Sequence, residues 1–228
     1  MPQQPQALFI AFILAVLTCI PTPAELQRPE CTPEELHYGM CFAKNPLQAV
    51  KLQRSAAVQN EIKAQVDAAK AYLQNIEPSS KKVITVDLDE TFLDTSGYTL
   101  KNPVFEFETW EKFHSSKAGR KYNKPVVDLI KYAQEKGFGV MFITGRPAYQ
   151  GEMTWKQVNI VKWDGGFLKP FTQHHPPSSL YKSETRKLLK TLGFEVVLNI
   201  GDQFSDFDLP IEPKDGEFLL PNVLYKIY

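Results

Sequence analysis

The sequence has no excess of charge of either sign, and it is poor in cysteine and histidine. Its 228 residues include 26 basic and 26 acidic side chains, three cysteines and four histidines. Nucleic-acid binding depends on clustered lysine and arginine, so the balanced charge argues against it. His174 and His175 are adjacent, but no further cysteine or histidine stands at ligand spacing. We therefore predict a polar loop there and no metal site.

Long hydrophobic runs are also missing, apart from one near the N-terminus. Residues 7–20 form an apolar run of 14 residues, which is short for a bilayer span and typical of the hydrophobic part of a signal peptide. Small residues follow, and we expect cleavage after Ala24. No lysine or arginine precedes Ala7, so an uncleaved anchor or a buried helix is the alternative. The pattern predicts a signal peptide over residues 1–24 and a secreted or periplasmic protein.

The three cysteines fit export. Cys19 lies within the predicted signal peptide, and its removal would leave Cys31 and Cys41 as a pair that could close a small disulfide loop. In the alternative, Cys19 is a lipid-modified N-terminus of an outer-membrane lipoprotein. Thr18 is bulkier than the residue usual before such a cysteine, which disfavours this alternative.

The rest of the chain has the composition of an ordinary globular domain, with 43% hydrophobic and 23% charged residues. Residues 25–44 show no periodic pattern and are predicted to be an irregular N-terminal tether. Asn45 provides an N-cap before a proline, and apolar residues then recur at spacings of three and four over residues 46–77. This pattern predicts one amphipathic helix, ended by Pro78, at the start of a domain over residues 45–228.

Short apolar runs alternate with helical patterns along this domain. Such alternation is typical of an α/β fold with a doubly wound parallel sheet and helices on both faces. Residues 95–123 are too long for a simple connection and are predicted to form a small inserted cap. Strands are expected at residues 83–86, 138–143, 167–172, 194–200 and 218–222, and further helices at 123–136, 149–161 and 183–192.

Polar side chains follow three of these strands directly. Asp87 and Asp89 end the first strand, and because residues i and i+2 of a strand share a face, their carboxylates should project together. The carboxyl ends of parallel strands lie on one edge of the sheet, where such folds place their chemistry. The later elements bring to the same edge Thr144 and Arg146, Asp202 and Asp206, and, at the start of a helix, Lys182.

This ordered set resembles the haloacid dehalogenase-like (HAD) superfamily of phosphoryl-transferring enzymes. The family's four motifs are matched in order by Asp87-Leu88-Asp89-Glu90-Thr91, Thr144-Gly145-Arg146, Lys182 and Gly201-Asp202-Gln203-Phe204-Ser205-Asp206. The segments DLDETFLDTSGY, TGRP, YKSETRK, GDQFSDF and FLLPN resemble its acid phosphatase branch. That branch includes plant acid phosphatases, vegetative storage proteins and bacterial lipoprotein phosphatases. The resemblance covers residues 45–228.

The resemblance implies hydrolysis in two steps through a phosphoaspartate. Asp87 would be the nucleophile, and Asp89 would protonate the leaving alkoxide and then deprotonate the attacking water. A Mg²⁺ ion would be held by Asp87, the backbone carbonyl of Asp89 and Asp202, which together offer the oxygen ligands that a hard cation prefers.

The resemblance also implies contacts to the phosphoryl group. Thr144 and nearby backbone N–H groups at Gly145 would contact its oxygens, and Lys182 would add a positive charge. Asp206 would orient water or Lys182, with an ordinary helix cap as the alternative. Arg146 would either contact phosphate or brace its loop.

The segment after the first motif offers candidates for substrate specificity. Aromatic residues cluster over positions 105–113, and Phe105 and Trp110 could stack on a nucleobase or aryl group. The alternative is a small hydrophobic core for the cap. Glu90 and Asp94 are more typical of turn or capping groups than of ligands.

The function predicted from these residues is an exported, Mg²⁺-dependent acid phosphatase acting on small phosphomonoesters, such as nucleotides or aryl phosphates. A phosphotransferase or 5′-nucleotidase using the same residues is one alternative. A non-catalytic storage or binding protein of the same fold is the other, and the presence of Asp87 argues against it. Association with a membrane is expected only through a lipid on Cys19.

Overall fold

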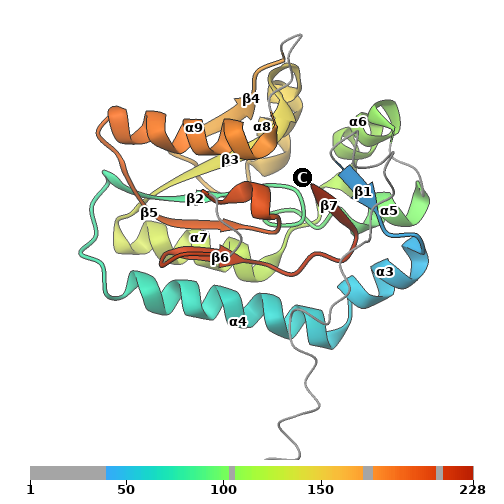
Figure 1. The fold of residues 1–228 in the computed structure, drawn as a ribbon, viewed down its shortest axis with the longest axis horizontal. Coiled ribbons are helices and arrows are strands. Elements are labelled where there is room, and N and C mark those ends of the chain that lie inside the picture. Colours follow the sequence, from blue (N-terminus) through green and yellow to red (C-terminus); the bar gives the residue numbers. More distant parts are fainter. Residues whose placement is uncertain (1–39, 103–105, 172–176, 209–212, 228) are drawn as a thin grey trace, which may run out of the picture.

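A sheet of five parallel strands forms the centre of the protein. The computed structural model describes residues 40–102, 106–171, 177–208 and 213–227. Within these ranges the strand order is β4–β3–β2–β5–β6, and all four neighbouring pairs are parallel. The predicted parallel α/β sheet is therefore confirmed (Figure 1). The strands are β2 (Lys82–Val86), β3 (Gly139–Pro147), β4 (Gly165–Lys169), β5 (Glu195–Gly201) and β6 (Glu217–Leu219).

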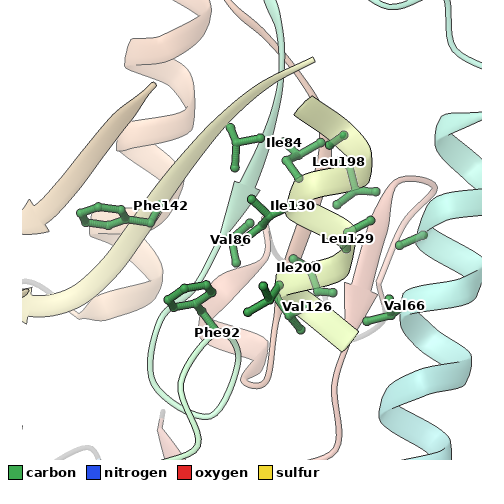
Figure 2. Packing of buried hydrophobic residues seen from close by; sticks show 14 of the residues in the cluster. Val66, Ile84, Val86, Phe92, Val126, Leu129, Ile130, Phe142, Leu198 and Ile200 are labelled. Carbon is green, nitrogen blue, oxygen red and sulfur yellow. The ribbon is translucent and has the colours of Figure 1, made fainter. Parts of the chain in front are cut away.

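Helices cover both faces of this sheet. Helices α4 (Ala56–Leu73) and α7 (Lys124–Lys136) lie along one face, and α9 (Ser178–Thr191) lies along the other (Figure 1). Two hydrophobic cores lie between these helices and the sheet, a larger one beneath α4 and α7 and a smaller one beneath α9. Each fully buried aliphatic side chain in them contributes about 1.5–3 kcal/mol relative to an exposed one. Figure 2 shows the larger core, in which β2 and β5 meet Val126, Leu129 and Ile130 of α7 and Val66 of α4.

Strand β2 sends alternate side chains to these two faces. Ile84 and Val86 belong to the core beneath α4 and α7, whereas Val83 packs with Leu189 of α9. The period of two places Asp87 on the same side as Val83, facing α9. The alternation in β2 therefore directs the first carboxylate toward the helix that carries Lys182.

The predicted single helix over residues 46–77 was wrong, because the chain turns at Arg54. Helix α3 (Pro46–Gln53) ends there, and Ser55 caps α4 by accepting a hydrogen bond from the Val58 N–H at 3.4 Å. The buried side chain of Gln53 donates to the carbonyl of Pro221 and accepts from the N–H of Val223, both at 3.1 Å. These partners are far away in sequence, so helical periodicity does not reveal the break.

A two-stranded antiparallel sheet adds the C-terminus to the domain. Strand β1 (Met40–Phe42) pairs with β7 (Tyr225–Ile227). The predicted tether over residues 25–44 is thus a strand at its end. Cys41 is disulfide-bonded; Cys31, its predicted partner, lies outside the described residues, as do Cys19 and the predicted signal peptide.

Helices occupy the predicted cap between β2 and α7. They are α5 (Ser96–Lys101), α6 (Phe107–Ser115) and the 3₁₀ turn η3 (Lys117–Gly119). Helices α5 and α6 lie at the same end of the molecule as β1 and β7 (Figure 1). Among the described residues, no helix combines the length and apolar character needed to cross a membrane.

Two helix boundaries differ from those predicted. The helix expected over residues 149–161 is a 3₁₀ turn, η4 (Ala148–Gln150), followed by α8 (Gly151–Val158). Helix α9 begins at Ser178, so Lys182 lies inside it and not at its first residue. The helix starts directly after Pro177, five residues before the predicted start at residue 183.

Candidate active site

The segments that follow Val86 of β2, Phe142 of β3 and Ile200 of β5 start side by side. Val86 pairs with both Phe142 and Ile200, since β2 lies between β3 and β5. The Asp87 N–H donates to the Ile200 carbonyl at 3.0 Å, which extends this ladder one residue beyond β2. The three polar motifs therefore leave the sheet from adjacent positions, as parallel topology requires.

Three carboxylates and one lysine meet at this edge. Oxygen atoms of Asp87, Asp202 and Asp206 all lie within 4.8 Å of one another. Lys182 reaches them from α9, forming ion pairs with Asp87 and, at 2.5 Å, with Asp206. All four residues are buried, with exposed fractions of 8% or less. The cluster is thus a concentrated, partly neutralised negative charge out of contact with bulk water.

The charges in this cluster perturb one another. Burial raises the pKa of Asp87 well above its usual value, and Asp206 and Asp202 raise it further while Lys182 opposes the shift. Burial and repulsion by Asp206 raise the pKa of Asp202 to about 7. Although burial alone would lower the pKa of Lys182, the carboxylates raise it, so the lysine is held charged. One lysine cannot balance three carboxylates, and the all-oxygen donor set fits a hard divalent cation.

Asp202 is oriented by three donors. Thr91 Oγ1 donates to its Oδ1 at 2.9 Å, and the side-chain amides of Gln203 and Asn222 donate to its Oδ2 at 2.7 Å. Asn222 belongs to the segment between β6 and β7, so the C-terminal part of the chain supports the cluster. Outer partners of this kind fix the orientation of a metal ligand.

Replacing Asn222 by alanine is therefore expected to weaken divalent-cation binding about tenfold, because Asp202 loses one of its donors. Titrating Mg²⁺ against activity at fixed substrate concentration measures the change. Asn75→Ala, which removes an exposed amide that bonds only to the Ala71 carbonyl, is the control and should leave the Mg²⁺ dependence unchanged. An equal Mg²⁺ requirement in wild type and Asn222→Ala would contradict the role of this donor.

Asp206 connects the last motif to α9. Its Oδ1 accepts a hydrogen bond from Lys182 Nζ. Its Oδ2 accepts one from the backbone N–H of Gln203 at 2.8 Å, which closes a tight turn. A Cβ at position 201 would collide with this carboxylate, which explains the glycine there. Asp206 thus both caps a turn and contacts the lysine, so the two roles considered for it coexist.

Asp89 lies apart from the carboxylate cluster and is paired with Arg146. The guanidinium donates to both carboxylate oxygens, from Nε at 2.8 Å and from Nη2 at 2.6 Å. Its remaining N–H groups donate to Thr154, Gln157 and His114, at 3.3, 2.7 and 2.9 Å. All five N–H groups thus have acceptors within the chain. These contacts support the bracing role of Arg146 over phosphate binding.

This pairing sets the charge of Asp89. Burial alone would raise its pKa, but the charge and hydrogen bonds of Arg146 lower it below the usual value. Such a forked pair combines a strong interaction with a fixed orientation. Asp89 is therefore ionised and oriented in the structure, with its side chain still 15% exposed.

The phosphate-contacting residues, which were predicted to follow a strand ending at Ile143, lie within β3, because this strand continues to Pro147. Thr144 is buried, and its Oγ1 accepts from the Arg146 N–H at 3.3 Å. Gly145 lies against the start of α9, where a Cβ would stand 3.1 Å from Ser178 Oγ. Their contacts to phosphate stay predictions.

Glu90 and Asp94 act in the turn that follows the first motif. The Glu90 backbone has a φ of 60°, and its carboxylate accepts hydrogen bonds from the Thr95 N–H and hydroxyl. Asp94 accepts from the Ser96 N–H at 3.1 Å and pairs with Lys121. Both therefore have the turn and capping contacts that were expected of them.

The aromatic residues of the cap pack on one another. Trp110 stacks edge-on with Tyr98 at 4.9 Å between ring centroids and lies 4.1 Å from the ring of His114. Phe113 also packs against Tyr98. The contacts of Trp110 favour the alternative of a small core within the cap, although its role in specificity is untested. Phe105, His174 and His175 lie outside the described residues.

Two functional candidates could not be identified from the sequence. Asn222 lies within the FLLPN segment, but nothing in that segment indicates which carboxylate it contacts. His114 is a lone histidine on a helical segment, which usually indicates nothing beyond packing. Only the packing of α6 against α8 brings it to Arg146 of β3.

A parallel α/β sheet that gathers three carboxylates and a lysine at its carboxyl edge defines a HAD-type phosphoryl-transfer fold. A family model described as HAD superfamily, subfamily IIIB (acid phosphatase), matches residues 41–228. The chain belongs to this family of phosphoric monoester hydrolases.

Known relatives and structures agree with this assignment. Acid phosphatase 1 of Solanum lycopersicum is 28% identical over 179 residues, covering 73% of this chain and 68% of its own length. Vegetative storage protein 1 of Arabidopsis thaliana is 30% identical over 152 residues, covering 62% of this chain and 54% of its own. The class C acid phosphatase of Bacillus anthracis with tungstate bound shares the fold, with a TM-score of 0.59, 21% identity, and coverage of 79% of this chain and 85% of that one.

Proposed function

We propose that this protein is a Mg²⁺-dependent acid phosphatase that hydrolyses small phosphomonoesters through a phosphoaspartate on Asp87. The observation that carries the proposal is the cluster of Asp87, Asp202 and Asp206 around Lys182, with Asp89 held separately by Arg146. This arrangement supplies a nucleophile, oxygen ligands for a cation, and a carboxylate placed apart from both for proton transfer.

In the first step a carboxylate oxygen of Asp87 attacks phosphorus, and the bond from phosphorus to the leaving oxygen breaks. Lys182 balances charge on the nucleophile and on the phosphoryl group, aided by Thr144 and the backbone at Gly145. Asp89 gives a proton to the leaving oxygen. Because Arg146 lowers the pKa of Asp89 in the free protein, the negative charge of the bound phosphate must raise it again before that transfer.

In the second step Asp89, now ionised, takes a proton from water, and the resulting hydroxide attacks phosphorus and releases Asp87. The pair with Arg146 suits this step without further change, since it holds Asp89 ionised. Asp87, Asp202 and the backbone carbonyl of Asp89 would hold Mg²⁺, with Asp206 adjacent. When bound, this cation would neutralise the clustered carboxylates and stabilise negative charge on the phosphoryl oxygens.

An assay of p-nitrophenyl phosphate hydrolysis with and without Mg²⁺ tests the proposal. We expect turnover that is lost on chelation and restored by Mg²⁺. Unchanged turnover after complete removal of divalent cations would contradict the metal requirement, and no turnover in either condition would favour a storage protein on the same fold. The similarity to vegetative storage protein 1 makes this the relevant rival.

The Mg²⁺ requirement should depend on pH. The pKa of Asp202 is raised to about 7 in the metal-free protein, so protons compete with the cation once the pH falls below that value. As the pH falls below that value, the proton on Asp202 is expected to raise the apparent Kd for Mg²⁺ by up to about tenfold per pH unit. Protonation of Asp87, whose pKa is also raised, adds to this rise. Calorimetric titration of the protein with Mg²⁺ between pH 5 and pH 8 measures this. A flat Kd across that range would contradict it.

The same residues serve hydrolysis and phosphoryl transfer to an alcohol, so the two reactions are distinguished by their products. Adding an alcohol acceptor and analysing the products separates these reactions.

We further propose export, supported by the apolar run over residues 7–20. The N-terminal mass of the mature protein distinguishes cleavage after Ala24 from a lipid on Cys19.

A further inference from the structure

His114 is a buried histidine in direct contact with the proposed proton-transfer pair. It lies on α6 of the cap, is 1% exposed and packs between the rings of Trp110 and Phe113. Its Nδ1 is 2.9 Å from Arg146 Nη2 and 2.8 Å from Gln157 Nε2. Its Nε2 is buried, has no hydrogen-bond partner among the described residues, and lies 3.8 Å from Asp89 Oδ1.

The contacts determine which nitrogen of this ring carries the proton. Arginine is always protonated and only donates, so Nδ1 must accept from Arg146. Gln157 fits the same assignment. Its Oε1, which lies 3.2 Å from Nδ1, accepts from Arg146 Nη1, and its Nε2, which lies closer to Nδ1, is left to donate to His114 and to the carbonyl of Gly119. The neutral ring therefore carries its proton on Nε2, the atom that faces Asp89. Burial and the Arg146 charge keep the ring neutral, since they lower its pKa to about 4.

We propose that His114 is a positioning residue, through which the cap helix α6 orients Asp89 for proton transfer. Nδ1 of the ring accepts a hydrogen bond from Arg146 Nη2 and so helps to fix the orientation of the guanidinium group that binds Asp89. Its Nε2 lies 3.8 Å from Asp89 Oδ1, the oxygen that also accepts from Arg146 Nη2. Oδ2 accepts from Arg146 Nε, and we assign it as the oxygen that meets the leaving group. A buried donor without a partner costs free energy, and Asp89 Oδ1, at 3.8 Å, is an acceptor toward which it can close.

The role of His114 follows the charge of Asp89 during the reaction. When Asp89 gives its proton from Oδ2 to the leaving alkoxide, an alcohol and an ionised carboxylate are formed. The negative charge that develops on the carboxylate is met at Oδ1 by both Arg146 Nη2 and the Nε2–H of His114. The inference rests on the proposed function, in which Asp89 is the acid, and adds to it a contribution from the cap.

The test uses leaving groups that need protonation to different degrees. An alkyl phosphate such as glycerol phosphate needs an acid for its alkoxide, whereas p-nitrophenyl phosphate releases a stable anion. His114→Asn retains a polar atom near Nδ1 but loses the donor at Nε2. We expect its kcat/KM to fall about thirtyfold for glycerol phosphate and less than about threefold for p-nitrophenyl phosphate. His114→Gln places an amide N–H near Nε2 and should restore glycerol phosphate hydrolysis to within about fivefold of wild type.

The controls separate positioning from folding. Lys112→Ala, on the exposed side of the same helix where Lys112 pairs only with Glu108, should leave both substrates unaffected. Parallel losses on both substrates in His114→Asn, or no loss on either, would overturn the inference. If His114→Asn does not fold, His114→Gln decides: a loss of up to about fivefold for glycerol phosphate, with p-nitrophenyl phosphate unchanged, supports the inference, whereas equal losses on both substrates or no loss on either would overturn it.

This inference and the proposed function fail in different ways. A wild-type protein without phosphatase activity, or an Asp87→Asn variant that keeps it, would contradict the proposed function. An active wild type and an inactive Asp87→Asn variant, together with parallel effects in the His114 variants, would contradict only the role of His114.

Discussion

Replacing Asp87 by asparagine is expected to lower kcat by at least about 10⁴-fold while leaving the fold intact. The amide has nearly the shape of the carboxylate but cannot attack phosphorus. It also relieves part of the repulsion with Asp202 and Asp206, which otherwise raises the pKa of Asp87, so the variant should be no less stable than wild type. Steady-state hydrolysis of p-nitrophenyl phosphate with saturating Mg²⁺, together with thermal unfolding, measures both effects.

Asp67→Asn is the matched control for this substitution. Asp67 lies on the exposed side of α4 and pairs only with Lys63, and surface changes of this kind are usually neutral. Its activity should equal that of wild type. Phosphatase activity that persists in Asp87→Asn would show that another group attacks phosphorus, and would refute the mechanism.

The second large effect is expected from Lys182→Met. Methionine fills a similar volume but removes the charge that Asp87 and Asp206 share. We expect kcat/KM to fall about 10²- to 10³-fold, because the nucleophile and the phosphoryl group lose a cationic partner. In the absence of Mg²⁺ the free energy of unfolding should also fall by about 3 kcal/mol, because two buried carboxylates are left unpaired.

Lys187 provides the control, one turn further along α9. Lys187→Met removes an exposed lysine that pairs with Glu184, and it should change neither activity nor stability measurably. Chemical denaturation with and without Mg²⁺ separates the electrostatic cost from packing, since added Mg²⁺ should recover part of the lost stability in Lys182→Met. A Lys182→Met variant with wild-type kcat/KM would contradict the role given to this lysine.

The sheet and its carboxyl edge could be predicted because their signals are local. The run Val83–Val86 is short, rich in β-branched residues and followed directly by Asp87. Consecutive residues therefore predict both this strand and the position where it ends. Apolar runs also precede Thr144 and Asp202 and predict two more strands, although β3 continues past the predicted end at residue 143 to Pro147. Right-handed crossovers then bring such strand ends to one edge without further information.

Long-range contacts account for most of what was missed. The helix predicted over residues 46–77 breaks because Gln53 bonds to the backbone near the C-terminus, and β1 is a strand only because β7 pairs with it. Neither partner can be found from local periodicity. Lys182 was expected at a helix start, but α9 begins at Ser178.

The environment of Asp89 also depends on distant elements. Its partner Arg146 comes from β3, and the other acceptors for that guanidinium are Gln157 and Thr154 of α8 and His114 of α6. The sequence left open whether Arg146 contacts phosphate or braces its loop, because both roles use the same residue type. The choice depends on how many acceptors surround the guanidinium, which only the packed structure reveals.

The most direct test of the central claim is the mass of the peptide containing Asp87 after acid quenching during turnover. The Asp89→Asn variant with p-nitrophenyl phosphate is the appropriate system, because this leaving group needs no acid, while the loss of the base slows hydrolysis of the intermediate. The account predicts one added phosphoryl group on Asp87 and none when Asp87 is also replaced by asparagine. A phosphoryl group found on another residue, or turnover in Asp89→Asn with no phosphorylated peptide at any quench time, would contradict it.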